Sequence, residues 1–186
     1  MQLNRITAPA AEPVTLAEAK AHARIDIADD DALITRCIAA AREWVEAETG
    51  RALMTQTWRL TLDAWPDGGA VILRRPPVQS VAEIRTFTAG GVAAIWVASN
   101  YGLALGREPQ ALMRVSAAWP VPGRTRAGIE IDITCGYGAL PTDVPAVLRQ
   151  AVLVQTARLY ARRGEDEAAA PLDVLAMIAP YRVITL

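Results

Sequence analysis

The sequence predicts an α+β protein, in which a helical scaffold of N-terminal helices and a long C-terminal helix carries an antiparallel β insert in the middle. Two patterns support this fold class. Apolar residues recur at helical spacing in residues 14–50 and 142–180, whereas residues from about 55 to 135 alternate apolar and polar types, as half-buried strands do. A chain of 186 residues that is 52% hydrophobic can bury one core, so we predict a single domain, 1–186, ending in a tail at 181–186.

The first helical region contains two predicted helices. A short one, within residues 15–25, opens with a capping box in which Thr15 and Glu18 satisfy each other's backbone amides. A longer one follows the acidic run at 29–31, which favours a helix N-terminus, and stops at Gly50. The predicted core face of the longer helix consists of Leu33, Ile34, Cys37, Ile38, Ala41, Trp44 and Val45.

The middle region carries the signs of antiparallel strands. Residues 57–62 and 129–134 alternate apolar and polar side chains, which predicts two strands with one wet face each. Gly90-Gly91 marks the turn of a predicted hairpin, and a second possible hairpin surrounds residues 106–110. Pro76-Pro77 excludes a central strand at that point, because proline cannot donate to a ladder.

The long C-terminal helix, predicted to begin at Asp143 and to end at Gly164, is apolar on two sides. One stripe is formed by Leu148, Val152 and Leu159, and a broader one includes Val154 and Ala157. A helix that is apolar on two sides must be covered on two sides. We therefore predict that Leu148, Val152, Leu159 and Val154 pack between helices, against the β insert or against a neighbouring subunit.

The chain closes with an apolar, β-branched segment after Pro180, which ends any helix there. Val183, Ile184 and Thr185 favour an extended chain, and an extended segment can add to an exposed sheet edge. We expect residues 181–186 to lack a fixed partner in the free protein and to dock on another molecule. The alternative is that the tail folds back on the β insert of its own subunit.

No motif of catalysis, metal binding or cofactor binding stands out. His22 is the only histidine, and Cys37 and Cys135 fit no metal spacing. The start of the chain lacks a signal-peptide pattern, no stretch is apolar enough to span a bilayer, and a formal net charge of −1 does not attract nucleic acid. We predict no enzyme, no cofactor and no membrane association, and the alternative is a small cytoplasmic enzyme with a site assembled from distant residues around His22 or Cys135.

The order of the segments resembles the head–tail connector, or head-completion adaptor, proteins of long-tailed phages and phage-like gene transfer agents. The matching segments are "VTLAEAKAHARID", "DDALITRCIAAAREWVEAETGRAL", "LRRPPVQSV", "ITCGYG", "VPAVLRQAVLVQTARLY" and "PYRV". Together they cover most of the chain, and their succession is more specific than any one of them. Cys135 departs from the small residue, such as alanine, that the family prefers there.

The resemblance implies a structural protein of the virion, assembled in the bacterial cytoplasm as a ring, typically of twelve subunits, below the portal. DNA passes through the lumen without sequence-specific binding, a tail-side stopper or tail component binds the far face, and no cofactor is needed. The resemblance assigns the portal or subunit interface to Tyr181, Arg182, Val183, Ile184 and Leu186. Another virion structural protein, such as a stopper or tail terminator, is a further alternative.

Overall fold

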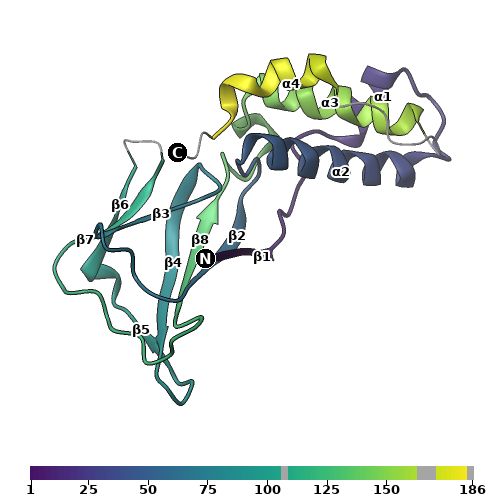
Figure 1. Ribbon diagram of the computed structural model, residues 1–186. Helices are drawn as coiled ribbons and strands as arrows, with labels where there is room; N and C mark the ends of the chain where they lie inside the picture. The colour runs from purple at the N-terminus through teal and green to yellow at the C-terminus, as the bar shows by residue number, and fades with distance from the viewer. Residues whose placement is uncertain (106–108, 163–170, 184–186) are drawn as a thin grey trace. The chain divides into compact units, whose positions relative to one another are not determined.

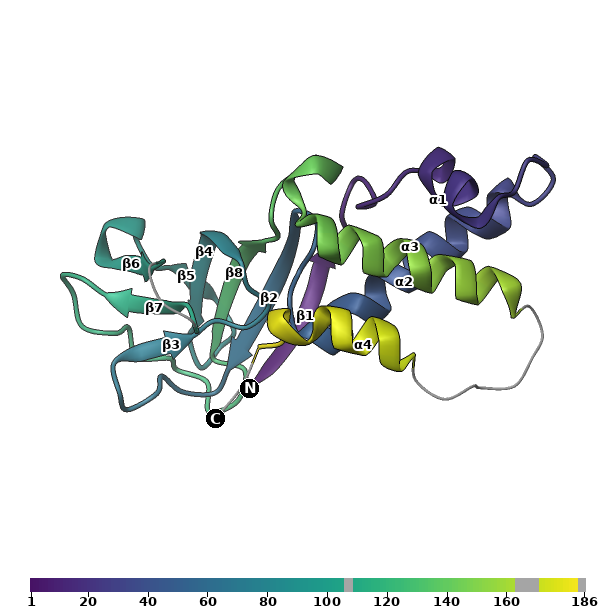
Figure 2. The ribbon, with the colours of Figure 1, turned by 90° about the horizontal axis from the view of Figure 1, so that it is seen from above.

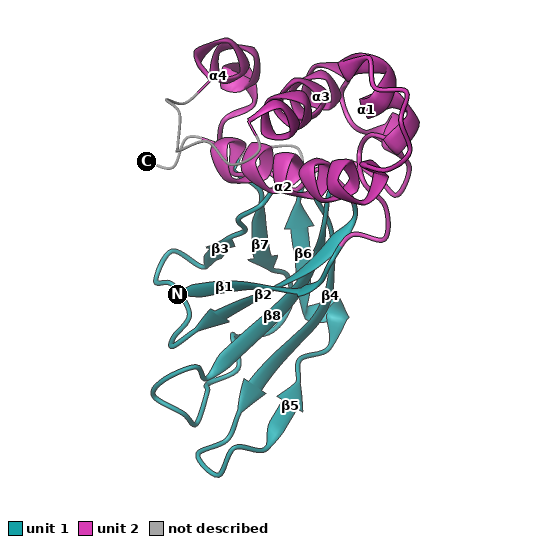
Figure 3. Ribbon diagram, turned by 90° about the vertical axis from the view of Figure 1, so that its right-hand side faces the viewer, with its two compact units in different colours: residues 1–8, 55–136 teal, residues 9–54, 137–186 magenta. Residues whose placement is uncertain are grey.

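The computed structural model describes residues 1–105, 109–162 and 171–183 and divides into two compact units (Figure 3). The β unit comprises residues 1–8 and 55–136, and the helical unit comprises residues 9–54 and 137–186. The predicted α+β fold class is confirmed, with helices before and after antiparallel sheets along the chain (Figure 1). No helix in the described residues is both long and apolar enough to cross a membrane.

The helical unit is built from four α-helices and two short 3-10 turns in its described residues. These are α1 (Leu16–Ala23), α2 (Asp31–Thr49), η2 (Pro141–Asp143), α3 (Ala146–Ala161), α4 (Leu172–Ile178) and η3 (Ala179–Tyr181). Helix α3 packs against α1, α2 and α4, and Figure 2 shows α4 running alongside it. Their shared core is formed by Val14, Ala19, Ile34, Ile38, Ala41, Val45, Leu53, Met54, Val144, Leu148, Ala151, Val152, Val174 and Ile178.

The predicted capping box at the start of α1 is confirmed. The Glu18 N–H donates to Thr15 Oγ1 at 3.1 Å, and the Thr15 N–H donates to the Glu18 carboxylate at 2.7 Å. The backbone hydrogen bond from Thr15 holds the pKa of Glu18 below its ordinary value, because it stabilises the carboxylate. Glu18 also accepts from Arg149, so the cap ties α1 to α3.

The acidic run lies at the start of α2, as predicted, and its side chains also bond to other helices. Asp30 occupies the N-cap position but forms no side-chain capping bond, and its carboxylate accepts from the Tyr160 hydroxyl at 2.5 Å instead. Asp31 pairs with Lys20. These carboxylates therefore tie α2 to α3 and α1. Helix α2 ends at Gly50 as predicted, with a left-handed φ of 71° that favours glycine.

The β unit contains two antiparallel sheets among the described residues. Its strands are β1 (Gln2–Thr7), β2 (Gln56–Leu62), β3 (Ala70–Ile72), β4 (Val78–Phe87), β5 (Ala93–Ile95), β6 (Tyr101–Ala104), β7 (Ala111–Arg114) and β8 (Ile129–Cys135), and η1 (Ala98–Asn100) precedes β6. The larger sheet has the order β1-β2-β8-β4-β5, and the smaller one has the order β3-β7-β6. The predicted hairpins are confirmed as β4–β5 and β6–β7, although residues 106–108 in the second turn lie outside the described residues.

The alternation in β2 and β8 produces one buried and one polar face of the larger sheet. Leu60 and Leu62 on β2 and the isoleucines at 129, 131 and 133 on β8 are buried. Strand β1 was not predicted, since residues 2–7 lack a clear alternation. It nevertheless pairs with β2, so its strand conformation depends on this pairing and not on an alternation of apolar and polar residues within β1.

The polar face of the larger sheet carries a network of ion pairs across three strands. The Asp132 carboxylate on β8 accepts from Arg59 Nε on β2 at 2.7 Å and from Arg85 Nη2 on β4 at 2.6 Å. The hydrogen bond to Asp132 raises the pKa of Arg59. Only 8% of Asp132 is exposed, so its carboxylate has lost most of its contact with water, and the two guanidinium groups compensate for that loss.

We expect Asp132→Asn to lower the free energy of unfolding by about 1–3 kcal/mol, because it leaves two partly buried guanidinium groups without their shared carboxylate. Urea denaturation of the two proteins measures the difference. Glu130→Gln is the matched control, since Glu130 contacts the same arginines only at 3.3 and 3.4 Å and should cost less. Equal stability of Asp132→Asn and the unmodified protein would contradict this account.

Candidate functional site

The C-terminal segment, defined here as residues 181–183, is bound to the end of helix α2. Arg51 Nε donates to the Tyr181 carbonyl at 2.6 Å, and the Val183 N–H donates to the Thr49 carbonyl at 2.8 Å. The Arg182 guanidinium pairs with the Glu48 carboxylate. Backbone and side-chain contacts together therefore fix the described part of the tail within the helical unit.

The expectation that the tail lacks a partner in the free protein is wrong for these three residues. The last carbonyls of an α-helix have no partner within the helix, and Val183 supplies a donor to one of them. The segment passes close to the helix end, since a Cβ built at Gly50 would lie in van der Waals contact with the Val183 Cβ, at 3.4 Å. Ile184 and Leu186 lie outside the described residues.

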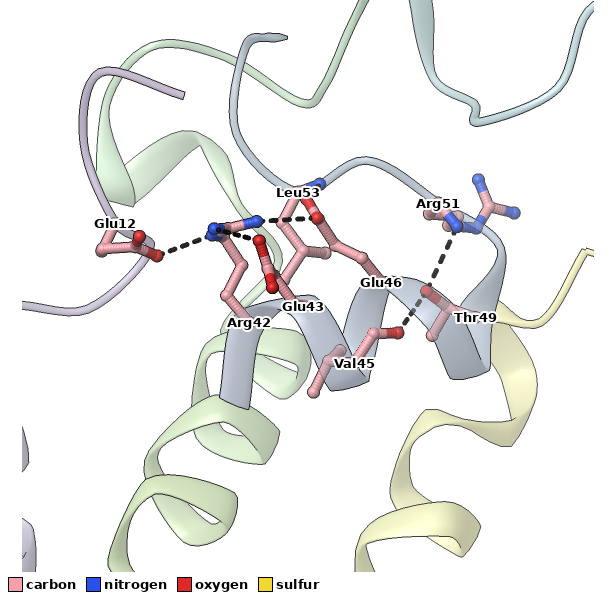
Figure 4. Close-up of polar contacts among 8 residues, drawn as sticks. All are labelled: Glu12, Arg42, Glu43, Val45, Glu46, Thr49, Arg51 and Leu53. Carbon is pink, nitrogen blue, oxygen red and sulfur yellow. Dashed lines mark hydrogen bonds and ion pairs between the residues drawn. The ribbon is translucent and has the colours of Figure 1, made fainter. Parts of the chain in front are cut away.

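A buried ion pair supports the end of α2 (Figure 4). Arg42 is 3% exposed, and its Nη1 donates to Glu46 Oε2 at 2.9 Å while its Nε donates to Glu12 Oε2 at 2.7 Å. The second oxygen of Glu46 accepts from the Leu53 N–H at 2.8 Å. This carboxylate thus joins the last turn of α2 to the loop that follows the helix and carries Arg51.

The charges of this group are fixed by their surroundings. Burial opposes the charge on Arg42, but the carboxylates of Glu46 and Glu12 outweigh it and raise the pKa of the guanidinium. Nearer the helix end, Thr49 Oγ1 donates to the Val45 carbonyl at 2.7 Å and accepts from the Arg51 N–H at 3.3 Å (Figure 4). The loop that receives the C-terminal segment is therefore anchored by buried polar bonds.

Sequence reasoning missed Arg42 and Glu46, which lie beside the predicted apolar face of α2 at a spacing of four residues. Opposite charges at that spacing are ordinarily an exposed helix pair. Both residues are nevertheless buried, at 3% and 4% exposure. One signal in the sequence could have indicated their burial. Ala41 and Val45, their neighbours in the chain, belong to the predicted core face, and the buried face of α2 extends past these apolar residues to include Arg42 and Glu46.

The four residues predicted for packing on α3 separate into different environments. Leu148 and Val152 are fully buried in the helical core, and Val154 is partly buried against it. Leu159 points in the same direction around the helix as Leu148 and Val152 but is 37% exposed. The buried residues of α3 end with Thr156, one turn earlier, so within this chain Leu159 is less covered than Leu148 and Val152.

The two cysteines and the histidine lie in different surroundings. Burial raises the pKa of the Cys135 thiol to about 12, so the thiol stays protonated at neutral pH and is a poor nucleophile. Cys37 is buried in the helical unit, and His22 is exposed on α1. Among residues 1–105, 109–162 and 171–183, no group of three histidine, cysteine or acidic side chains is placed to hold a metal ion.

Comparison with known proteins gives this arrangement a context. Residues 13–83 match the phage gp6-like head-tail connector protein family. The neck of an empty gene transfer agent (GTA) particle, computed with C6 symmetry, contains a chain that is 31% identical, with a TM-score of 0.86 over 100% of this chain and 97% of that chain. The chain belongs to the phage gp6-like head-tail connector family. This confirms the resemblance read from the sequence.

Two further structures match this connector at the same coverage of 100% of this chain and 97% of the other. The virion of a native GTA particle gives 31% identity and a TM-score of 0.84, and the neck of a native GTA particle computed with C12 symmetry gives 32% and 0.82. A search of curated proteins found no match. The family and these neighbours are structural components of particles and not enzymes, and the connector is accordingly a structural protein.

We expect Arg42→Met to destabilise the protein by about 3–5 kcal/mol, because it leaves the Glu46 charge buried without its ion-pair partner. Thermal or urea unfolding of the purified variant measures this. Glu43→Gln is the control, since the Glu43 side chain is 52% exposed and its contact with Arg42 is long, at 3.4 Å. A loss of similar size in both variants would contradict a special role for the buried pair.

Two truncations test how the C-terminal segment is held. We expect a chain ending at Ala179 to lose about 1–3 kcal/mol of stability, because the hydrogen bonds of Tyr181 and Val183 to the end of α2 are removed. A chain ending at Val183 keeps all of these bonds and should be more stable than the chain ending at Ala179. If both truncated chains unfold like the full-length protein, the contacts of residues 181–183 contribute nothing to stability.

Proposed function

We propose that this protein is a head–tail adaptor that forms a ring below the portal, joins a DNA-filled phage-like capsid to the tail and lets DNA pass. The observation that carries the proposal is full-length similarity, at 31–32% identity, to chains in GTA necks computed with C6 and C12 symmetry. Such symmetry is that of a cyclic assembly, and we propose twelve subunits. The protein would then act in the virion after assembly in the bacterial cytoplasm.

A cyclic ring requires two different surfaces on each subunit, because each copy contacts its two neighbours through unlike faces. The helical unit has exposed apolar side chains that its own core does not need, namely Leu140, Val147, Leu159 and Leu172. We assign Leu159 and the partly buried Val154 to subunit contacts of α3. Leu148 and Val152 serve the packing between helices instead, since no surface of either is left for a neighbour.

The C-terminal segment is our candidate for contact with the portal or an adjacent subunit. In this proposal Tyr181, Arg182 and Val183 are presented in a fixed conformation, and Ile184 and Leu186 extend the same contact. A segment that is already ordered loses less conformational entropy on binding than a free tail. The contacts of residues 181–183 with α2 support this, because they position the chain without covering Arg182.

In a ring through which DNA passes, the surface that lines the lumen must not bind DNA tightly. Every phosphate that a protein neutralises adds affinity, and a formal net charge of −1 keeps that contribution small. The adaptor in this proposal has no sequence-specific contact with DNA and needs no cofactor. Its function lies in shape and in protein contacts with the portal and with a tail-side stopper or tail component.

Electron microscopy of particles from cells that lack the gene tests the proposal. The expected result is capsids without tails, with tails restored by the unmodified gene, and an added ring of density at the portal in the restored particles. Native mass spectrometry of isolated necks gives the number of copies in the ring. Normal tailed particles in the absence of the gene would overturn the proposal.

We expect Leu159→Asp to leave the isolated protein folded but to reduce incorporation into necks, because a charge would face the neighbouring subunit. The change in unfolding free energy should be within about 0.5 kcal/mol, as for most surface substitutions. Val152→Asp is the contrasting variant and should fail to fold, since it buries a charge in the helical core. Full incorporation of Leu159→Asp would remove Leu159 from the proposed interface.

We expect His22→Ala and Cys135→Ala to leave tail attachment intact, because neither side chain has a catalytic role in an adaptor. Counting tailed particles per capsid in complemented cells measures this. Cys135→Ala serves at the same time as a packing control, since a small residue such as alanine is what the family resemblance leads us to expect at this position. A folded variant of either residue that yields no tailed particles would favour the enzymatic alternative.

A further inference from the structure

The larger sheet of the β unit ends in two strands that pair on one side only within the described residues. In the order β1-β2-β8-β4-β5, β1 has a partner only in β2, and β5 only in β4. All residues of β5 and all but one of β1 are exposed. An open strand edge presents unpaired backbone donors and acceptors and is a template for pairing with another chain.

Backbone geometry identifies the open groups of β5. The Thr88 N–H donates to the Val92 carbonyl, and the Trp96 N–H donates to the Ile84 carbonyl, both at 2.9 Å. Hydrogen-bonded and non-hydrogen-bonded pairs alternate along an antiparallel ladder. The backbone groups of Ala93 and Ile95 therefore point away from β4, toward the open side of the sheet.

Both edges also carry apolar side chains in contact with solvent. Val92, Ile95 and Val97 at the β5 edge are 61–68% exposed, and Ile6 on β1 is 45% exposed. Strand β5 contains no charged residue, and β1 contains a single one, Arg5. Charged side chains commonly protect natural edge strands from pairing, and these two edges have little of that protection.

The topology fixes how two such edges can meet. Every neighbouring pair in the sheet is antiparallel, so four steps from β1 to β5 bring the two edge strands into the same direction. Copies related by the small rotation of a many-membered ring keep nearly the same strand direction. Contact between β5 of one copy and β1 of the next would thus be a parallel pairing of unlike edges, which is the heterologous type that a ring needs.

We infer that the occupant of each edge is a second copy of this chain, with β5 of one subunit pairing in parallel with β1 of the next, so that the sheets continue from subunit to subunit around the ring. The inference rests on the proposed ring and names the surfaces that close it. Pairing of like edges, β1 with β1 or β5 with β5, would instead be antiparallel and two-fold, and would end after two copies.

Cysteine cross-linking in assembled necks tests the pairing. The side chains of Gln2, Asn4 and Ile95 lie on the polar face of the sheet, because their ladder partners are Thr61, Arg59 and Arg85. The natural cysteines, Cys37 and Cys135, are buried and do not interfere. We expect Gln2→Cys/Ile95→Cys or Asn4→Cys/Ile95→Cys to give ladders of covalent multimers on oxidation, and the three single variants to stay monomeric.

Proline substitution gives an independent readout. Ala93→Pro removes an N–H that faces the open side, so the variant should fold with nearly unchanged thermal stability but enter necks less than one tenth as efficiently as the unmodified protein. Ala94→Pro is the matched control, since the Ala94 N–H faces β4 and its loss should destabilise the fold itself. A folded Ala93→Pro protein that enters necks normally would overturn the inference.

The outcomes distinguish a failure of the proposed function from a failure of the edge pairing alone. If the unmodified protein is absent from necks or is not cyclic there, the proposed function fails. If it forms a ring but neither double variant gives multimers, only the edge pairing is wrong. Dimers from a single variant would indicate pairing of like edges and would likewise overturn it.

Discussion

The helical unit depends on one buried ion pair, Arg42 with Glu46. Glu46 uses one carboxylate oxygen for the guanidinium and the other for the Leu53 N–H, and a single side chain thereby links the last turn of α2 to the loop beyond its end. A buried charge is costly unless it is paired and hydrogen-bonded. The loop is therefore favoured in the position where the Leu53 N–H reaches the Glu46 carboxylate. Arg51 in that loop then binds the Tyr181 carbonyl, which places the C-terminal segment.

The β unit uses charge in a related way on its polar face. Asp132 on the central strand β8 binds arginines from the strands on both sides, and the apolar alternation of β8 supplies the opposite face. The ion pairs hold the register that the isoleucines require, because a slip of one residue would exchange the two faces. In both units a carboxylate on a central element ties its neighbours in place.

Periodicity in the sequence was enough to predict the fold class, and short local motifs were enough to predict the capping box at Thr15, the stop of α2 at Gly50 and the two hairpins. These features depend on residues close together in the chain. Strand β1, the burial of Arg42 and the docking of Val183 on Thr49 were not predictable, because each depends on a partner far away in sequence. The same holds for Leu159, which shares a stripe on α3 with the buried Leu148 and Val152 but is 37% exposed.

In the proposed adaptor ring, the two units offer different kinds of contact surface. Main-chain edges such as β1 and β5 give affinity to any extended strand, so they suit a contact between identical copies, where the same partner is always present at high local concentration. Recognition of a different protein needs side chains that discriminate. In the proposed portal contact this discrimination falls to Tyr181, Arg182 and Val183, which carry a partly buried ring, an exposed charge and an apolar group on a backbone bound to α2.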